Sequence, residues 1–371
     1  MVWRDFTYFM EIAQLYYPIY LLIVTLFSIQ VYGKYNKRIN PILGMQKRNL
    51  DGECLILMFF MILFIGLRPE SYVFVDMMNY IETYHAFYEN TQFVWDWTTE
   101  NFIFDNIFAY IGSRNLGTSF FFVIIAAIYF GCAYWGIRRL FPRDTAIAYL
   151  TFLGAFSTFS YATNGIKAGA AASLFILALS YYRKWIICVP LLIITLGFHH
   201  SMIMPIAAFI LAMLLKNPKH FFWIWLFCLI CAITHVYFFQ QLFAGLADDK
   251  AASYLYSTDT DWGGKSGFRI DFVLYSAMPV FVGYYAIYKY KIKSKVYDLL
   301  LKIYLTANGT WMLCMYAEFT NRIAYLSWAI YPLVLIFPIL EIGWGNRHYK
   351  TVANVFIAHL AFTLFMEILY Y

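Results

Sequence analysis

The sequence predicts an all-α polytopic membrane protein with about twelve transmembrane helices in a single transmembrane domain, residues 1–371. Hydrophobic residues make up 62% of the chain and charged residues only 13%, and the mean hydropathy is +0.62. These values lie far outside the composition of soluble domains. Aromatic residues form 22% of the chain, and such side chains suit a membrane because they bury a ring in lipid while a polar tip remains at the interface.

Apolar runs divide the chain into the expected spans, since a helix needs about 20 apolar residues to cross the hydrocarbon core. The runs are residues 15–33, 53–67, 117–137, 145–162, 166–182, 185–198, 201–215, 220–240, 271–289, 298–317, 323–342 and 351–369. The runs between residues 160 and 205 are short, so this region is also compatible with fewer, longer or broken helices. The first run lacks the flanks of a cleavable signal and is expected to be retained.

Basic residues predict the orientation, because Lys and Arg accumulate in cytoplasmic loops. With the N-terminus outside the cytoplasm, 19 of the 27 basic residues fall in the inner loops, and every inner loop contains at least two. Both termini are then outside. The two large outer segments are residues 68–116 and 241–270.

The cysteines and the net charge do not indicate metal or nucleic-acid binding. All six cysteines lie in apolar runs, where a thiol is most simply a small hydrophobic side chain. Cys228 and Cys231 have no second cysteine pair or histidine at zinc spacing, so neither a metal site nor a disulfide framework is predicted. The net charge of +6 carries little information about nucleic acid in a chain of this composition.

Four cations on the predicted outer face border apolar spans, where charge is costly to desolvate without a partner. They are Arg68, Lys167, Arg269 and Arg322. One explanation is structural: each snorkels, or pairs with a carboxylate such as Asp76, Asp271 or Glu318. The other explanation is a site for an anionic lipid head group, because guanidinium groups hold phosphate through two parallel hydrogen bonds.

The segment WDWTTENFIFDNIFAYIGSRN, residues 95–115, predicts an interfacial or re-entrant helix rather than a span. Its apolar positions are interrupted by Glu100, Asn101, Asp105 and Asn106. A segment that combines aromatic with hydrogen-bonding side chains could also hold the sugar portion of a lipid-linked substrate.

Two adjacent histidines, His199 and His200, stand at a predicted outer helix end in the segment GFHHSM. Neighbouring residues of a helix point in different directions, so at most one is expected to face a site. A neutral imidazole could accept a proton from a sugar hydroxyl, and an imidazolium could stabilise phosphate. The sequence leaves both roles open, beside a structural one.

Two further clusters lie on the predicted outer face. In YATNGIKAGAAASLF, Asn164 occupies a turn and Lys167 opens a helix of small residues; the small residues suit helix packing, and a cation beside free backbone N–H groups suits an anion. In MYAEFTNRIAYLSW, Arg322 and Tyr325 share a helix face, and Glu318 precedes Arg322 by one turn and could pair with it.

The order of these motifs resembles the EpsG family of Wzy-type polysaccharide polymerases, from about residue 53 to residue 342. The glycine, arginine, aspartate and tyrosine of that family fall on Gly66, Arg68, Asp76 and Tyr80, with the arginine one residue late. The family histidine falls on His199, and the late arginine and tyrosine fall on Arg322 and Tyr325. An arginine–glutamine pair of the family is replaced by Lys167 and Ala168, which keeps the charge but loses the guanidinium fork and the amide.

The resemblance implies a GT-C-like Wzy polymerase/ligase architecture in a bacterial inner (cytoplasmic) membrane, with the active site facing the periplasm or exterior. It implies transfer of a growing glycan from undecaprenyl pyrophosphate to a sugar hydroxyl of another undecaprenyl-linked repeat unit, without cofactor, nucleotide sugar or metal. Direct attack by the acceptor would invert the anomeric carbon. The implied partners are undecaprenyl-pyrophosphate-linked oligosaccharide, membrane lipid, a chain-length regulator and a flippase, and no nucleic acid.

Roles for individual residues follow from this scheme. The expected base is His199, with Asp76 as the second choice; Asp76 could instead orient Arg68. The expected pyrophosphate-binding residues are Arg68, Lys167, Arg269 and Arg322, and the expected substrate-binding residues are Asn79, Tyr80, Asn164, His200, Glu318 and Tyr325. Replacing Arg68 or Arg322 by Ala is expected to abolish elongation and leave the protein folded.

Three other functions compete with polymerisation. A lipid-linked glycan ligase would share the donor and differ in the acceptor. A membrane acyltransferase would carry its histidine in a cavity reached from the cytoplasm. A non-enzymatic flippase or transporter would show internal repeats and ionisable residues near mid-membrane, whereas most charges of this chain are at the ends of the runs.

Overall fold

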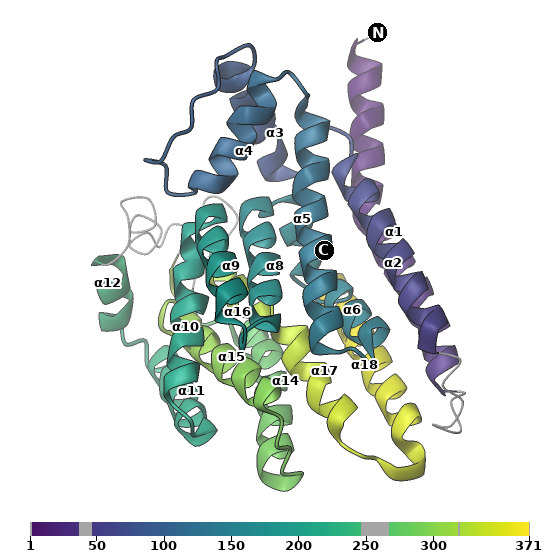
Figure 1. Ribbon diagram of the computed structural model, residues 1–371, viewed down its shortest axis with the longest axis vertical. Helices are drawn as coiled ribbons and strands as arrows, with labels where there is room; N and C mark the ends of the chain where they lie inside the picture. The colour runs from purple at the N-terminus through teal and green to yellow at the C-terminus, as the bar shows by residue number, and fades with distance from the viewer. Residues whose placement is uncertain (1, 37–46, 246–266, 318–319, 371) are drawn as a thin grey trace. The chain divides into compact units, whose positions relative to one another are not determined.

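The computed structural model describes residues 2–36, 47–245, 267–317 and 320–370, and all regular structure in these residues is helical (Figure 1). The predicted all-α class is therefore confirmed for the described part of the chain. The chain forms two compact units. The first unit contains Met1–Met202 and Gly343–Tyr371, and the second contains Ile203–Ile342.

The first unit is built around α5, which packs between α2 and α8, with α9 on the other side of α8. Helices α1 and α18 pair with each other and both contact α6. The elements are α1 (Val2–Asn36), α2 (Lys47–Gly66), α3 (Val75–Thr83), η1 (Tyr84–Tyr88), α4 (Phe102–Ser113), α5 (Thr118–Leu140), α6 (Thr145–Leu153), α7 (Thr158–Thr163), α8 (Ile166–Ser180), α9 (Trp185–Phe198), η2 (His200–Met202), η4 (Gly345–Arg347) and α18 (His348–Tyr370).

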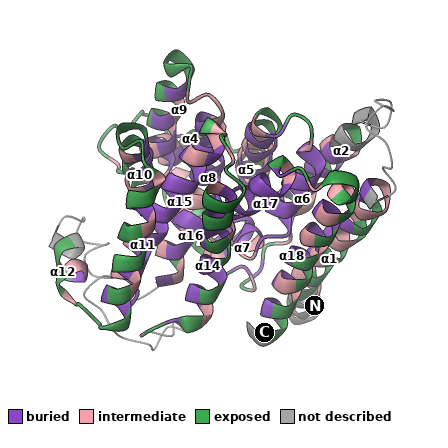
Figure 2. Ribbon diagram, turned by 90° about the horizontal axis from the view of Figure 1, so that it is seen from below, coloured by how far each residue is buried: buried purple, intermediate pink, exposed green. Residues whose placement is uncertain are grey.

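Burial within the first unit follows this arrangement. Figure 2 shows buried residues concentrated along α5, α6 and α8, and exposed positions recurring along α1 and α18. Helices α5 and α8 run parallel: Phe122 and Ile166 line one crevice near their starts. At their ends, the Arg139 guanidinium lies 3.7 Å from the centre of the Tyr181 ring. Because α5 and α8 are parallel, the chain between them must return to the end at which α5 began, and the predicted order of spans requires the same.

The second unit is built around α15, which packs against α10, α11, α16 and α17, while α14 packs on α17. Its centre holds a buried polar chain: the Trp225 indole N–H donates to Asn308, whose amide donates to Ser327. The elements are α10 (Ile203–Leu214), α11 (Pro218–Ile233), α12 (Phe238–Gly245), α14 (Ile270–Tyr284), η3 (Tyr285–Lys289), α15 (Lys295–Leu313), α16 (Thr320–Trp328) and α17 (Tyr331–Glu341).

Within the described residues, five helical segments are long and apolar enough to cross a membrane. They are Ile12–Tyr35, Thr118–Leu140, Ile270–Lys289, Thr320–Glu341 and Gly345–Ile368. Five shorter apolar helices accompany them: Gly52–Gly66, Ile166–Ser180, Trp185–Phe198, His200–Leu214 and Pro218–Ile233. The chain is therefore a helical membrane protein with several spans.

The predicted span 145–162 is divided in the structure into α6 and α7, and the helix breaks after Leu153. Backbone carbonyls freed by a break must find other donors in an apolar surrounding. Two hydroxyl groups supply them: Tyr20 donates to Leu153 O and Thr158 donates to Phe152 O. The Tyr129 hydroxyl also donates to Thr158 O at the start of α7. The break is a hydrogen-bonded feature that an apolar run does not reveal.

The predicted outer segment 68–116 contains α3, η1 and α4, and α4 is a helix of 12 residues within the expected interfacial segment 95–115. In Figure 1, α3 and α4 lie beside the first turns of α5 and beyond one end of α8 and α9. Of the second outer segment, 241–270, residues 246–266 lie outside the described part of the chain, and so does Glu318.

Candidate functional site

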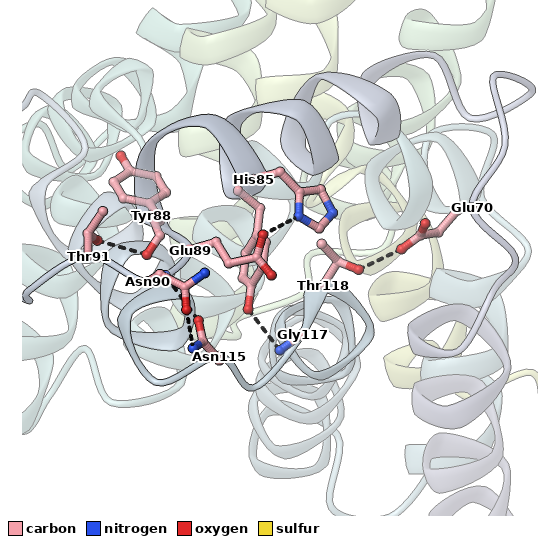
Figure 3. Close-up of polar contacts among 10 residues, drawn as sticks. Glu70, His85, Tyr88, Glu89, Asn90, Thr91, Asn115, Gly117 and Thr118 are labelled. Carbon is pink, nitrogen blue, oxygen red and sulfur yellow. Dashed lines mark hydrogen bonds and ion pairs between the residues drawn. The ribbon is translucent and has the colours of Figure 1, made fainter.

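Hydrogen bonds join the segment after η1, the segment after α4 and the residue before α5 (Figure 3). The Tyr84 hydroxyl accepts a hydrogen bond from Gly117 N–H at 2.9 Å. Asn115 donates to the side chain of Asn90 at 2.8 Å and accepts from the Asn90 backbone at 3.1 Å. Both asparagines have positive φ, a conformation that Asn tolerates better than most residues. The Tyr84 bond ties η1 to the residue before α5, and the asparagine pair ties the segment after η1 to the segment after α4.

One face of helix α4 contacts the first turn of α8 and the C-terminal end of α9. Asn101 and Asp105 are four residues apart and so lie on the same side. The Asn101 side chain accepts from the His200 backbone N–H at 3.0 Å, and Asp105 accepts from the Lys167 ammonium at 2.9 Å. A Cβ on Gly197 would lie 2.6 Å from the Ile103 side chain, so α9 approaches α4 closely here and a larger residue at position 197 would require that side chain to shift.

Lys167 is therefore paired in this structure. Its ammonium forms an ion pair with Asp105, and the two side chains are 26% and 22% exposed. The same nitrogen lies 4.7 Å from the centre of the Phe104 ring, a favourable position for a cation. Because the pair remains partly solvated, screening weakens it, and an anionic ligand can compete with Asp105 for the ammonium.

Arg68 is 4% exposed and acts as an anchor between two helix ends. Its two terminal nitrogens donate to Ile65 O at the end of α2, at 2.9 Å, and to Thr163 O at the end of α7, at 3.1 Å. Cations are favoured at the carbonyl end of a helix. The hypothesis that Asp76 orients Arg68 is not supported by these bonds, since backbone carbonyls hold the guanidinium.

The remaining surroundings of Arg68 are aromatic and apolar. The guanidinium carbon lies 4.6 Å from the centre of the Phe122 ring and 5.3 Å from that of Phe74. Burial lowers the pKa of Arg68 to about 10, although the nearby Tyr16 and Tyr80 oppose this shift. Arg68 thus stays charged at neutral pH, and its Nε–H is buried without a hydrogen-bond partner among the described residues.

A narrow crevice opens beside this guanidinium. It is lined by Arg68, Phe122, Ile125, Ala126, Tyr129, Tyr161, Ala162 and Ile166. Asn164 follows directly on α7, and its side-chain oxygen is buried with no hydrogen-bond partner among the described residues. Buried polar atoms are usually paired. In this region the Asn164 oxygen, an acceptor, and the Arg68 Nε–H, a donor, have no partner among the described residues.

Tyr80 connects the two cations of the first unit through aromatic contacts. Its ring centre lies 5.9 Å from that of Phe104, which contacts Lys167, and 6.5 Å from that of Phe122, which contacts Arg68. Asn79 is exposed and Asp76 is half-buried in the first turn of α3. The structure thus brings Arg68, Tyr80 and Lys167 into one aromatic cluster.

His199 is half-buried at the end of α9, and Ser201 determines its tautomer. The Ser201 backbone N–H donates to His199 Nδ1 at 3.1 Å, and the Ser201 hydroxyl lies 2.6 Å from the same nitrogen. A ring nitrogen that accepts from an N–H has no proton of its own. The neutral ring therefore carries its proton on Nε2 and presents a hydrogen-bond donor there.

His200 differs from His199 in exposure and in contact. Its side chain is exposed, and its backbone N–H is the group bonded to Asn101. The expectation that at most one of the two faces a site stays a prediction.

In the second unit, Arg269 is 9% exposed and stands directly before α14. It donates two hydrogen bonds to the Asp271 carboxylate, at 3.0 and 2.7 Å, and its guanidinium carbon lies 3.7 Å from the centre of the Phe272 ring. The pairing of Arg269 with Asp271, the structural explanation for this cation, is present in the structure.

Arg322 and Tyr325 lie on α16 of the second unit. Arg322 is exposed, whereas Tyr325 is half-buried, with its ring centre 5.4 Å from that of Trp328. The start of α16 is tied to α15 by a hydrogen bond from the Trp311 indole N–H to the Thr320 hydroxyl, at 2.9 Å. Any pairing of Arg322 with Glu318 lies outside the described residues.

Sequence reasoning missed Asp105 and Ser201 as partners of the site residues. For Ser201 a local signal existed, since the side chain two positions after a helix-terminal residue can reach it. Asp105 is 62 residues from Lys167, so no local signal pointed to the pair. Sequence reasoning also overlooked α18, which buries His359, Thr363 and Glu367 at one-turn intervals; ionisable side chains are therefore not confined to the ends of the spans.

The arrangement in the first unit can bind an anion in several ways. Arg68 and Lys167 supply charge, the neutral His199 ring supplies an N–H donor, and Asn164 supplies an acceptor for a hydroxyl. Preorganised donors of this kind stabilise the charge that develops on a leaving group.

Comparisons with known proteins agree with the motif order. The model of the EpsG family matches residues 53–371, which is most of the chain. No curated protein and no solved structure matches it. The resemblance seen in the sequence is thereby confirmed, and the chain belongs to the EpsG family.

Proposed function

We propose that this protein is a membrane-embedded polysaccharide polymerase. Membership of the EpsG family, over residues 53–371, carries this proposal and suggests a polymerase-type function. The proposed reaction transfers a growing glycan from undecaprenyl pyrophosphate to a hydroxyl of an undecaprenyl-linked repeat unit. The bond between the anomeric carbon and the pyrophosphate oxygen breaks, a glycosidic bond forms with inversion, and the hydroxyl proton passes to a base.

The proposed architecture is that of a GT-C-like enzyme with about twelve crossings of a bacterial inner membrane and its site on the outer face. The distribution of basic residues supports this orientation. The five apolar helices shorter than a typical span are counted as crossings in this scheme, since local thinning of the bilayer accommodates short helices.

In the first unit, Lys167 and Arg68 are the proposed pyrophosphate-binding groups. An incoming pyrophosphate carries more charge than the Asp105 carboxylate and would displace it from Lys167. Arg68 would contribute through its Nε–H, which has no partner among the described residues, while its other nitrogens keep α2 and α7 in place. Tyr80, Asn79 and Asn164 would contact the sugars.

The proposed role of His199 is that of a hydrogen-bond donor to the leaving pyrophosphate. Its neutral tautomer has Nδ1 bonded to Ser201 and the proton on Nε2, so the ring is arranged to donate rather than to accept. Asp76 is then the proposed base, because a half-buried carboxylate on α3 can take a proton without a change of tautomer. This reverses the order of preference that the sequence suggested.

In the second unit, Arg322 and Tyr325 are the proposed substrate contacts, together with Glu318. Arg322 is exposed on α16. Arg269, by contrast, already donates two hydrogen bonds to Asp271, so its proposed contribution is to support the start of α14 rather than to bind pyrophosphate directly.

The test is elongation by the purified protein in nanodiscs that contain undecaprenyl-pyrophosphate oligosaccharide, followed by gel analysis. A ladder of lengthened glycans in the absence of nucleotide sugar and metal supports the proposal. Transfer to a different acceptor without a ladder would indicate a ligase. Unchanged substrate that crosses the bilayer of a vesicle would indicate a flippase, and the proposal would be wrong.

A further inference from the structure

An exposed group of aromatic rings lies on the outer segment of the first unit. We call Phe93, Trp95, Trp97, Phe102 and Tyr110 the aromatic platform. Ring centres are 5.2 Å apart for Trp95 and Trp97, 5.6 Å for Trp97 and Phe102, 6.4 Å for Phe93 and Trp95, and 5.4 Å for Phe93 and Tyr110. The rings thus form a continuous chain of contacts.

The platform exposes much apolar surface. Trp97 is 73% exposed, Tyr110 45% and Trp95 40%, and the neighbouring Val94 is 75% exposed. Single exposed aromatic side chains are common, whereas a contiguous group commonly marks a binding surface.

The platform is held in a defined conformation by Asn106, which is buried. The Asn106 amide donates to Asp96 O at 2.6 Å and accepts from Asp96 N–H at 2.8 Å, so both polar groups of the Asp96 backbone are fixed. The Asp96 carboxylate in turn accepts from the Thr98 hydroxyl and backbone N–H, each at 2.7 Å. Asp96 lies between the two tryptophans, and a surface ordered in advance binds with a smaller entropic cost.

Charge distinguishes a glycan from a lipid surface as the occupant. Residues 69–114 contain seven carboxylates, Glu70, Asp76, Glu82, Glu89, Asp96, Glu100 and Asp105, and one cation, Arg114, whose guanidinium carbon lies 5.5 Å from the centre of the Tyr110 ring. Insertion of these rings into lipid would desolvate the Asp96 carboxylate, which is exposed between the two tryptophans. Carboxylates do, however, accept hydrogen bonds from sugar hydroxyls, and rings pack against the apolar faces of sugars.

We propose that the aromatic platform binds the glycan chain several sugars away from the pyrophosphate, and that it favours neutral or amine-bearing repeat units over polyanionic ones. The inference rests on the proposed function, which supplies the chain. Phe102 begins α4 directly after Asn101, and the next turn carries Asp105, which contacts Lys167. The platform therefore continues outward from the Lys167 end of α4.

The test measures glycan binding without lipid or turnover. The protein is placed in nanodiscs, because sugar-headed detergents would compete, and tryptophan fluorescence is followed on titration with maltohexaose or a hexamer of galacturonic acid. We expect saturable binding of maltohexaose and at least tenfold weaker binding of the anionic hexamer. Trp97→Ala and Asn106→Leu should each weaken maltohexaose binding about fivefold or more, whereas Trp223→Ala, at an exposed tryptophan of α11, should not.

Wild-type affinity for maltohexaose in both variants, or equal affinity for both hexamers, would overturn the proposal. Binding of the nanodisc protein to phosphatidylglycerol vesicles that is lost in Trp97→Ala would also overturn it, since the platform would then be a membrane contact. These outcomes do not depend on elongation. If glycan binding behaves as expected and no ladder forms, the proposed function fails and the glycan-binding surface stands.

Discussion

The ammonium of Lys167 lies 2.9 Å from the Asp105 carboxylate, although the two residues are 62 positions apart in the sequence. Asp105 competes with pyrophosphate for the cation in the proposed scheme. Asp105→Asn removes the competing charge, and a partly exposed pair contributes about 0.2–1 kcal/mol. We expect a KM for lipid-linked substrate about two- to fivefold lower, with kcat retained. Lys167→Ala should raise KM. A fall in kcat with unchanged KM in Asp105→Asn would assign Asp105 to the chemical step instead.

Arg68→Ala should lower both stability and elongation, which corrects the expectation that this variant stays fully folded. Removal of the side chain leaves the Thr163 carbonyl without its guanidinium donor and the Ile65 carbonyl with only the backbone N–H of residue 68, at 3.4 Å, and hydrogen bonds to charged groups contribute about 1.5–3 kcal/mol each. We expect a clearly lower midpoint of thermal unfolding in nanodiscs. Arg114→Ala is the matched control, because Arg114 is exposed. An unchanged midpoint for Arg68→Ala would contradict the anchoring role.

Replacing His199 by the amide residues Gln and Asn distinguishes its role as a hydrogen-bond donor from its role as an acceptor. Gln places its N–H near the position of Nε2, and Asn places its polar groups near Nδ1. If His199 donates through Nε2, His199→Gln should retain elongation at about a tenth or more of wild type, and His199→Asn should lose about 100-fold or more. Equal loss in both variants, together with an active Asp76→Asn protein, would restore His199 as the base.

The pH dependence of the aromatic platform follows from Asp96. The Thr98 hydroxyl, and then its backbone N–H, hold the pKa of Asp96 below its usual value of 3.8. A carboxyl whose pKa is lower in the folded state contributes stability that is present above the unfolded pKa and is lost as the pH falls through the folded pKa.

We therefore expect the emission of Trp95 and Trp97 to stay constant from pH 7 to 4 and to change below that range. The emission is obtained by difference from a Trp95→Phe, Trp97→Phe variant. Thr98→Val should move the change to higher pH. A transition near neutral pH in the wild-type protein would show that another group controls this loop.

Asn308 should be important for the stability of the second unit. It is fully buried and joins the Trp225 indole to the Ser327 hydroxyl. Asn308→Leu leaves the buried Trp225 indole N–H without this acceptor, at a cost of about 1–3 kcal/mol, while the Ser327 hydroxyl keeps its bond to Ala324 O. The midpoint of thermal unfolding should fall by more than in Thr310→Val, a change at a half-buried position of the same helix. Equal midpoints would mean that the indole finds another acceptor.

Sequence reasoning located the polar groups of the site and could not identify their contacts. The sequence placed Arg68, Tyr80 and Lys167 on one predicted outer face without showing that they converge, and in the structure they join one aromatic cluster. It did not reveal that Arg68 anchors α7, because Thr163 is 95 residues away and offers only a backbone carbonyl. Any residue can supply a carbonyl, so no side-chain pattern marks it.

The sequence alone determined the class of the protein, because hydropathy and the spacing of apolar runs are local properties that membrane insertion reads directly. It also identified the family, because the order of the motif residues can be read without knowing which residues they contact. Only the tertiary structure decided which cations are already paired, which nitrogen of His199 carries the proton, and where the predicted span 145–162 breaks. The Lys167 pair depends on a partner that packing brings within about 3 Å, and the His199 tautomer depends on the local conformation that places Ser201 at that distance. Composition encodes neither distance.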